Sequence, residues 1–350
     1  MDISSREQKI IKILLRQNNL SSSKIHEEFV GTGDDISLVT VKRALSGMVS
    51  KKLILKDGLG RSSSYEISTL GRLFSDIEAT EYCAIEPDRR YGQNCYNQNL
   101  FSAIPDIIFS AQELEKLEVA TAEYYCRIKN ASPTIEKKEL ERLIIELSWK
   151  SSKIEGNTYT LLDTEKLILE NKEALGHTQN EKQMILNHKE AFTFVHNNSA
   201  SFKILTRPYI EKLHEIMVKD LDIGKGFRHG VVGITGSVYQ PLDNEHQIRE
   251  QLDILIETIN RVETAYSKAL IAILGISYLQ PFEDGNKRTG RLLANALLLA
   301  YGYAPLSYRS IKEEEYRSAT LVFYELNSIV PFKNIFIEQY DFAAKNYLVK

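Results

Sequence analysis

The chain has 350 residues, 43% of them hydrophobic, and a formal net charge of −3 at pH 7. This composition excludes an intrinsically disordered chain, and the small negative charge excludes a globally basic nucleic-acid binder. Three cysteines at unrelated spacings form neither a metal pattern nor a disulfide framework. Apolar runs stay far below the ~20 residues that cross a bilayer. We expect a cytoplasmic protein with no membrane partner and at least two domains.

Residues 1–68 favour a small separate domain. Helical periodicity runs from Arg6 to Arg16, and serine clusters at 21–23 and at Ser37 are typical helix starts. Two β-rich stretches follow, at 53–56 and 64–68, joined by a glycine turn. Three helices followed by a hairpin resemble a winged helix-turn-helix domain.

The charge of this domain leaves its partner open. Residues 1–68 hold 11 Lys and Arg against 8 Asp and Glu, so the domain is positive while the rest of the chain is negative. The residues expected on the exposed side of a recognition helix are Thr40, Lys42, Arg43 and Ser46. This excess of positive charge agrees with contact to DNA phosphates through residues 1–68. It agrees equally with a role in protein interaction.

Residues 69–135 are expected to connect the domains, with prolines at 87, 105 and 133 and one helical stretch at 111–128. From residue 136 onward, apolar stripes predict a mainly α-helical domain extending to 345. One short segment between the predicted helices, 231–241, has β-branched residues around a Gly-Ser tip, and this pattern predicts a β-hairpin. The expected helices cover residues 140–152, 163–172, 181–196, 207–219, 246–260, 265–279, 285–301 and 311–326.

The most informative stretch is Leu279–Arg291, with the sequence LQPFEDGNKRTGR. Gly285 and Asn286 permit a tight turn whose N–H groups point into one concavity, at the positive end of the following helix. Arg288 and Arg291 project from one helix face. Asp284 offers a hard oxygen ligand that suits Mg²⁺ bridging phosphates. Together these groups indicate a site for a nucleoside triphosphate.

The same stretch resembles the signature loop of the Fic-domain family, H-P-F-x-[DE]-G-N-[GK]-R-x-x-R. Every position matches in register except the first, where Gln280 stands in place of the family's catalytic histidine. The resemblance covers residues 136–345 and implies a Fic-type helical bundle with a β-hairpin flap. The winged unit is an N-terminal addition to it.

The resemblance also implies roles in binding ATP and Mg²⁺. Asp284 would hold the metal, and Arg291 would grip the γ-phosphate. The phosphates would be bound by Gly285, Asn286, Lys287 and Arg288. Tyr316 would lie against the adenine, although a place in the core explains this tyrosine equally well.

A second motif resembles the family's inhibitory sequence [ST]-x-x-x-E-[GN]. Here it consists of Ser151, Glu155 and Gly156, on a helix predicted near 140–156. A carboxylate beside Arg291 would form a bidentate pair with the guanidinium and occupy the group meant for the γ-phosphate. The alternative is an ordinary helix C-terminus, with Gly156 after the last turn and Glu155 on the surface.

A third motif resembles the family's target-binding flap, usually G-S-x-Y-x-P-P. The flap residues are Thr235, Gly236, Ser237, Val238 and Tyr239. Its edge would pair with an extended segment of a target protein. A hairpin with only a structural role is the alternative. His214 and Arg228 match recurring family positions that pack or position the flap.

In the family's reaction, the loop histidine takes the proton from a Ser, Thr or Tyr hydroxyl of a target protein, and AMP passes from ATP to that oxygen. Glutamine cannot accept this proton, so we expect a protein adenylyltransferase scaffold, autoinhibited by Glu155, that transfers AMP poorly. Gln280 is either native or an introduced replacement. The alternatives are a nucleotide-binding pseudoenzyme that acts as a DNA-binding regulator and an antitoxin-like partner module. Family members also often form homodimers.

Overall fold

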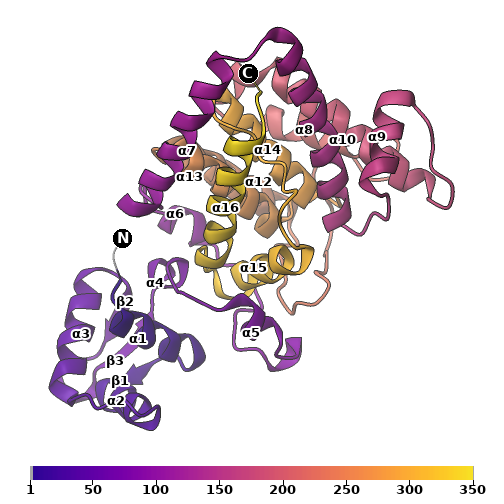
Figure 1. Cartoon of the computed structure of the whole chain (residues 1–350). Coiled ribbons are helices and arrows are strands. Elements are labelled where there is room, and N and C mark those ends of the chain that lie inside the picture. The colour runs from indigo at the N-terminus through magenta and orange to yellow at the C-terminus, as the bar shows by residue number, and fades with distance from the viewer. Residues whose placement is uncertain (1–2, 350) are drawn as a thin grey trace. The chain divides into compact units, whose positions relative to one another are not determined.

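The computed structural model describes residues 3–349, and the chain is mainly α-helical with one small sheet near the N-terminus (Figure 1). The chain forms two compact units. The first unit contains the residues up to Ile104, together with Ile234–Tyr239 and Ser318–Phe332. The second contains Pro105–Gly233, Gln240–Arg317 and the residues from Lys333 on. Among the described residues, no helix has both the length and the apolar character needed to span a bilayer.

The first unit begins with three helices and a three-stranded antiparallel sheet. Ser21 and Ser37 cap the second and third helices as the serine pattern predicted, and Ser4 caps the first helix, which was not predicted. Each serine accepts a backbone N–H from the first turn. The sheet order is β1-β3-β2, with Lys56 opposite Tyr65. The helices and hairpin expected from the sequence are present, whereas a winged-helix function remains a prediction. The bounds are α1 Ser5–Arg16, β1 Leu20–Ser21, α2 Ser22–Gly31, α3 Leu38–Ser50, β2 Ile54–Asp57 and β3 Ser64–Ile67.

The remainder of this unit consists of short helices and the segments that return to it late in the chain. Ile10, Leu14, Val41 and Leu45 are fully buried in a core that also includes Val322. The short helices are α4 Thr69–Leu73, α5 Ala79–Cys83 and α6 Leu100–Ala103, with 3₁₀ turns η1 Gly60–Ser62 and η2 Pro87–Arg89.

The second unit is a bundle built around α13 and α14. Every residue of α13 is buried, which explains why its sequence is apolar all round rather than striped. A Cβ at Gly290 would lie 3.2 Å from the carbonyl oxygen of Ile273, so glycine allows α14 to pack closely on α13. Its helices are α7 Ala111–Lys129, α8 Pro133–Ile154, α9 Leu161–Glu170, α10 Gln179–Asn197, η3 Ser199–Lys203, α11 Arg207–Met217, α12 Glu245–Arg261, α13 Ala265–Leu279 and α14 Asn286–Ala300. Two more helices, α15 Glu313–Leu326 and α16 Val330–Asn346, each contain residues of both units.

The segment 231–241 differs from the prediction. It contains no strand, and Gln240 alone makes an isolated β-bridge, so the predicted β-hairpin is wrong at the level of secondary structure. A turn replaces it, closed by the N–H of Ser237 donating to the carbonyl oxygen of Ile234. Gly230 and Gly236 both have positive φ, which bends the backbone away from an extended ladder.

Candidate functional site

The loop between α13 and α14 is shaped by two residues in the left-handed region. Gln280 has φ 49° and ends α13, and Gly285 has φ 79° and precedes α14. A Cβ at Gly285 would also lie 3.0 Å from Cγ1 of Val218, so glycine is required for conformation and for space. No side chain caps α14. Its first N–H groups and the positive end of its dipole therefore remain available to an anion.

Asn286 holds this loop closed. Its side-chain oxygen accepts the N–H of Phe282 at 2.9 Å, and its amide donates to the carbonyl oxygen of Phe282 at 2.8 Å and to Oε1 of Gln280 at 2.9 Å. Gln280 in turn donates from Nε2 to the carbonyl oxygen of Ser277 at 2.7 Å. Both amide atoms of Gln280 therefore have partners, and this side chain fastens the end of α13.

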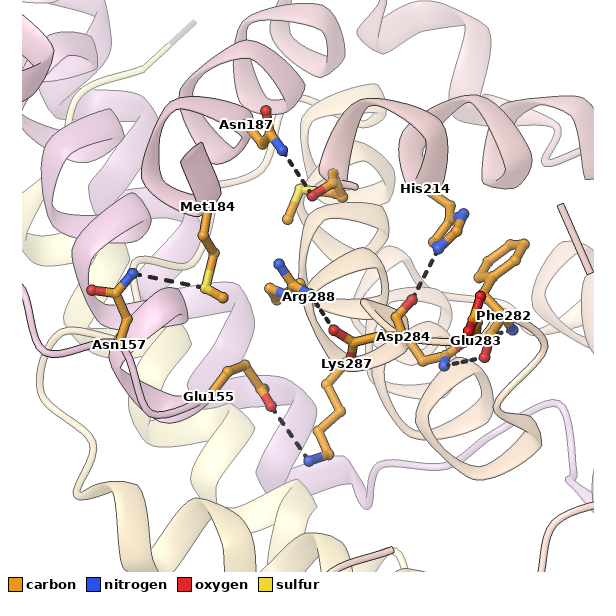
Figure 2. Close-up of polar contacts among 12 residues, drawn as sticks. Glu155, Asn157, Met184, Asn187, His214, Phe282, Glu283, Asp284, Lys287 and Arg288 are labelled. Atoms are coloured by element: carbon orange, nitrogen blue, oxygen red, sulfur yellow. Dashed lines mark hydrogen bonds and ion pairs between the residues drawn. The ribbon is translucent and has the colours of Figure 1, made fainter. Parts of the chain in front are cut away.

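Arg288 and Asp284 form an ion pair at one side of the loop (Figure 2). Arg288 is 2% exposed and Nη2 lies 2.9 Å from Asp284, whereas Nη1 is buried without a hydrogen-bond partner among the described residues. Burial lowers the pKa of Arg288. His214 donates from Nε2 to the carbonyl oxygen of Asp284 at 2.9 Å and stacks on Phe282, with ring centroids 3.8 Å apart. Burial lowers the pKa of His214 to about 4, so a neutral imidazole supports the loop.

Arg291 is fully buried and surrounded by groups from α8 and α15. Nε donates to Oγ of Ser151 at 2.8 Å, and Nη2 donates to the carbonyl oxygen of Ser151 at 2.9 Å. Tyr316 lies on another side, with its hydroxyl 3.5 Å from Nη1 and its ring centroid 5.5 Å from the guanidinium carbon. Tyr316 is 1% exposed. The structure thus places it beside Arg291, and its contact with adenine stays a prediction.

Glu155 supplies the carboxylate beside Arg291. Oε1 lies 2.9 Å from Nη2 of Arg291. Figure 2 shows the second contact, in which Oε2 lies 3.4 Å from Nζ of Lys287. Burial would raise the pKa of Glu155, but the positive charges of Arg291 and Lys287 outweigh it and lower the pKa to about 2. Glu155 is also the residue that ends α8, and Gly156 follows with φ 97°. The helix end expected by the alternative is present, but Glu155 is 18% exposed and faces Arg291 rather than lying on the surface. The expected bidentate pair is not formed, because Oε1 faces Arg291 and Oε2 faces Lys287.

His188 belongs to this arrangement, and the sequence analysis did not find it. His188 is fully buried on α10, and Nδ1 donates to the carbonyl oxygen of Met184 at 3.1 Å. Nε2 therefore accepts the hydroxyl of Ser151 at 2.7 Å, and that hydroxyl oxygen accepts Arg291. Burial, together with Arg288 and Arg291, lowers the pKa of His188 to about 3. A lone histidine 37 positions from Ser151 gives no sequence signal.

Arg228 fixes the two ends of the flap segment. Its guanidinium donates to the carbonyl oxygens of Gly230 and Leu242, and Nε donates to that of Gln280 at 2.6 Å. A cavity of about 290 Å³ lies beside this segment, lined by residues 224–232 and Glu283. This cavity, too, was missed by the sequence analysis. The predicted flap residues 235–239 all belong to the first unit.

The residues of the loop fit a magnesium ion that is held mainly by phosphates. Within residues 3–349, no group of three or more His, Cys, Asp or Glu side chains is arranged to hold a metal ion. Asp284 nevertheless presents a carboxylate that is 66% exposed and engages only Oδ2 with Arg288. Magnesium commonly uses one or two carboxylates and completes its coordination with phosphate oxygens and water.

Comparisons with known proteins agree with this geometry. The profile of the Fic/DOC family matches residues 204–298. A protein adenylyltransferase Fic from Nematostella vectensis is 29% identical over 186 residues, which cover 51% of this chain and 43% of the relative. One from Drosophila virilis is 30% identical over 164 residues, covering 44% and 32%. This chain thus matches less than half the length of these relatives.

Solved structures show the same fold. A Fic family protein from Desulfovibrio desulfuricans has a TM-score of 0.56 at 23% identity, covering 69% of this chain and 75% of that one. Fic-1 from C. elegans has a TM-score of 0.56 at 18% identity, covering 68% and 71%. The predicted Fic fold is therefore confirmed.

Proposed function

We propose that this chain, which contains a Fic/DOC-family domain, binds Mg·ATP at the start of α14 and has the scaffold of a protein adenylyltransferase. The observation that carries the proposal is the pair of buried arginines beside an uncapped helix N-terminus. A buried guanidinium atom without a partner, Nη1 of Arg288, leaves an unmet hydrogen bond that a phosphate oxygen would satisfy.

The remaining groups suit a triphosphate. The free N–H groups of Asn286 and Lys287 and the side chain of Arg288 would bind the inner phosphates, and Arg291 would bind the γ-phosphate. Asp284 would hold Mg²⁺, which neutralises phosphate charge when bound. The flap residues 235–239 would position an extended segment that carries a Ser, Thr or Tyr hydroxyl.

Glu155 opposes this function. It occupies Arg291 with a charge opposite to that of the guanidinium, so a γ-phosphate must displace it. Phosphate and carboxylate compete for one buried cation, and the pair is stable across the physiological pH range because the pKa of Glu155 is about 2. We therefore propose that the terminal turn of α8 inhibits the productive binding of ATP.

Gln280 limits catalysis. AMP transfer requires a base that takes the hydroxyl proton, and such a base typically contributes ~10²–10⁴-fold to the rate. The amide of Gln280 has no basic nitrogen, and both of its polar atoms are already hydrogen-bonded. We propose that the chain with Gln280 binds nucleotide and transfers AMP at most slowly.

The test restores the base and removes the inhibitor together. We expect the double variant Gln280→His, Glu155→Gly to incorporate label from ATP labelled at the α-phosphate into itself or into a co-incubated protein. The matched control, Gln280→Ala with Glu155→Gly, has the same open site without a base and should stay unlabelled. Binding of Mg·ATP without labelling by the histidine variant would reject the transferase proposal and favour a nucleotide-binding pseudoenzyme.

A second candidate, DNA binding by the first unit, is favoured by the surface of α3. Lys42, Arg43 and Ser46 are exposed, while Val41 and Leu45 are buried on the opposite side of the helix. Binding of the full chain to duplex DNA should weaken as salt rises, and Lys42→Ala with Arg43→Ala should reduce the salt dependence. Equal affinity of the wild type and this double variant would exclude α3 as the contact.

A further inference from the structure

Glu325 is a buried carboxylate in the first unit that the proposed catalytic chemistry does not use. It lies on the part of α15 that belongs to this unit and is 1% exposed. It accepts the hydroxyl of Tyr82 at 2.7 Å, the hydroxyl of Ser237 at 2.6 Å and Nη1 of Arg90 at 3.2 Å. A buried charge persists only when it is paired and hydrogen-bonded, so these three donors together stabilise it.

Arg90 joins the same group to the backbone of the flap segment. Its side chain is 5% exposed. Nη1 also donates to the carbonyl oxygen of Gly236 at 2.9 Å. The other guanidinium nitrogens donate to the carbonyl oxygens of Ile85 and Cys83, at 2.8 and 3.1 Å. One arginine thus ties the segment after α5 both to Glu325 and to the flap.

The flap turn is held by side-chain contacts as well as by its own backbone. Within the turn, the N–H of Ser237 donates to Ile234 and the N–H of Tyr239 donates to Oγ of Ser237 at 3.1 Å. Tyr239 is 1% exposed and stacks on Tyr324, with ring centroids 5.6 Å apart. The side chain of Ser237 therefore couples the turn directly to Glu325.

We propose that Glu325 and Arg90 are positioning residues that set the conformation of flap residues 234–239, so that the segment 82–93 of the first unit controls docking of the target. The ends of the flap are fixed separately, since Arg228 binds the carbonyl oxygens of Gly230 and Leu242 together with that of Gln280. When the turn loses its contacts with Glu325 and Arg90, the backbone of residues 234–239 takes a different course between these fixed ends. The consequence for target docking rests on the proposed transferase function, whereas the control of the flap conformation does not.

Hydrogen exchange of the full-length chain tests the conformational part. Glu325→Gln removes the charge that Arg90, Tyr82 and Ser237 share, and we expect exchange at 234–239 to accelerate at least 10-fold. Peptides from α1, α3, α13 and α14 should change less than twofold. The matched control is Glu315→Gln, which alters an exposed glutamate on the same helix and should leave the flap unchanged.

Unchanged exchange at the flap in Glu325→Gln would overturn the proposal. A uniform acceleration across all peptides would also overturn it, because Glu325 would then maintain the fold rather than the flap. Should the buried substitution prevent folding, Ser237→Ala leaves Glu325 in place and removes the flap's side-chain contact with it, together with the bond from the N–H of Tyr239 to Oγ. This variant must then reproduce the local acceleration, and normal exchange would refute the proposal.

A second readout separates this inference from the proposed function. In the Gln280→His, Glu155→Gly background, Glu325→Gln should lower kcat for labelling at least 10-fold while the Kd for Mg·ATP changes less than twofold. An equal loss of kcat and of affinity for Mg·ATP would indicate general damage to the fold and would contradict a positioning role for Glu325. Failure of the parent double variant to label would reject the transferase function, and the exchange result would still decide whether Glu325 sets the flap.

Discussion

Glu155→Gln tests the competition at Arg291 with a minimal change of shape. Glutamine is isosteric with glutamate, so the substitution removes the negative charge and leaves the space around Arg291 filled. Two effects of opposite sign follow. The folded chain without ligand loses stability, because a fully buried guanidinium loses its counter-charge. Binding of a triphosphate strengthens, because its terminal phosphate no longer displaces a carboxylate.

Both magnitudes follow from the contacts. Breaking a buried ion pair costs about 3–5 kcal/mol. Glu155 is 18% exposed, and Arg291 keeps its contacts with Ser151 and Tyr316. We therefore expect the free energy of unfolding to fall by about 2 kcal/mol, below that range. The Tm should fall by roughly 2–4 °C, because a change of one kcal/mol shifts the Tm of a long chain only slightly. A hydrogen bond to a charged group contributes about 1.5–3 kcal/mol, which corresponds to roughly 10–100-fold in ATP affinity.

Calorimetry with Mg·ATP and Mg·ADP, together with thermal unfolding, measures these effects. ADP lacks the γ-phosphate, so its affinity should change less than about threefold. Glu141→Gln is the matched control, because it changes an exposed glutamate on the same helix. An unchanged ATP affinity in Glu155→Gln, or an equal gain for ADP, would refute competition for Arg291.

Three further predictions concern the supports of the loop. The free energy of unfolding should fall as pH drops from 6.5 towards 4.5, by up to roughly 1 kcal/mol per pH unit for each of His188 and His214, because burial lowers both pKa values and the unfolded chain binds protons first. Urea titrations should show this slope reduced in His188→Gln and His214→Gln, and an unchanged slope would contradict it. Gly285→Ala should cost about 1–3 kcal/mol, since φ is 79° and the new methyl group meets Val218; wild-type stability by chemical denaturation would exclude this strain. Asn286→Ala leaves the buried N–H of Phe282 unpaired and should cost about 1–3 kcal/mol, with weaker binding of Mg·ATP by calorimetry, whereas unaltered binding would show that the loop closes without Asn286.

Short-range sequence patterns were enough to predict most of the helices and the loop between α13 and α14. The prediction for 265–279 coincides with α13, because a continuous apolar run between a threonine cap and a proline leaves few other structures. The caps at Ser21 and Ser37 and the Gly285 turn depend on neighbours within four residues, and the structure has them where the sequence placed them. Helix α16 was not predicted, since Pro331 and the mixed composition after it obscure its stripe.

Long-range contacts were beyond the sequence. The segment 231–241 has the residues of a hairpin, yet it forms no strand, because Arg228 takes the carbonyl oxygens of Gly230 and Leu242 and glycines bend the chain. Glu155 was found only through its motif. His188 and Glu325 act through partners far away in the chain, at 37 positions for Ser151 and 243 for Tyr82. No local pattern reports such contacts.

The left-handed residue that ends α13 has a consequence for how the activity can change. Codons for glutamine and histidine differ only in their third base, so one transversion exchanges these two side chains. The neighbours of Gln280 are a carbonyl oxygen of Ser277 and an amide N–H of Asn286. A neutral imidazole also carries one donor and one acceptor. The surroundings therefore suit either residue, and under the proposed function a single base change would supply the missing general base.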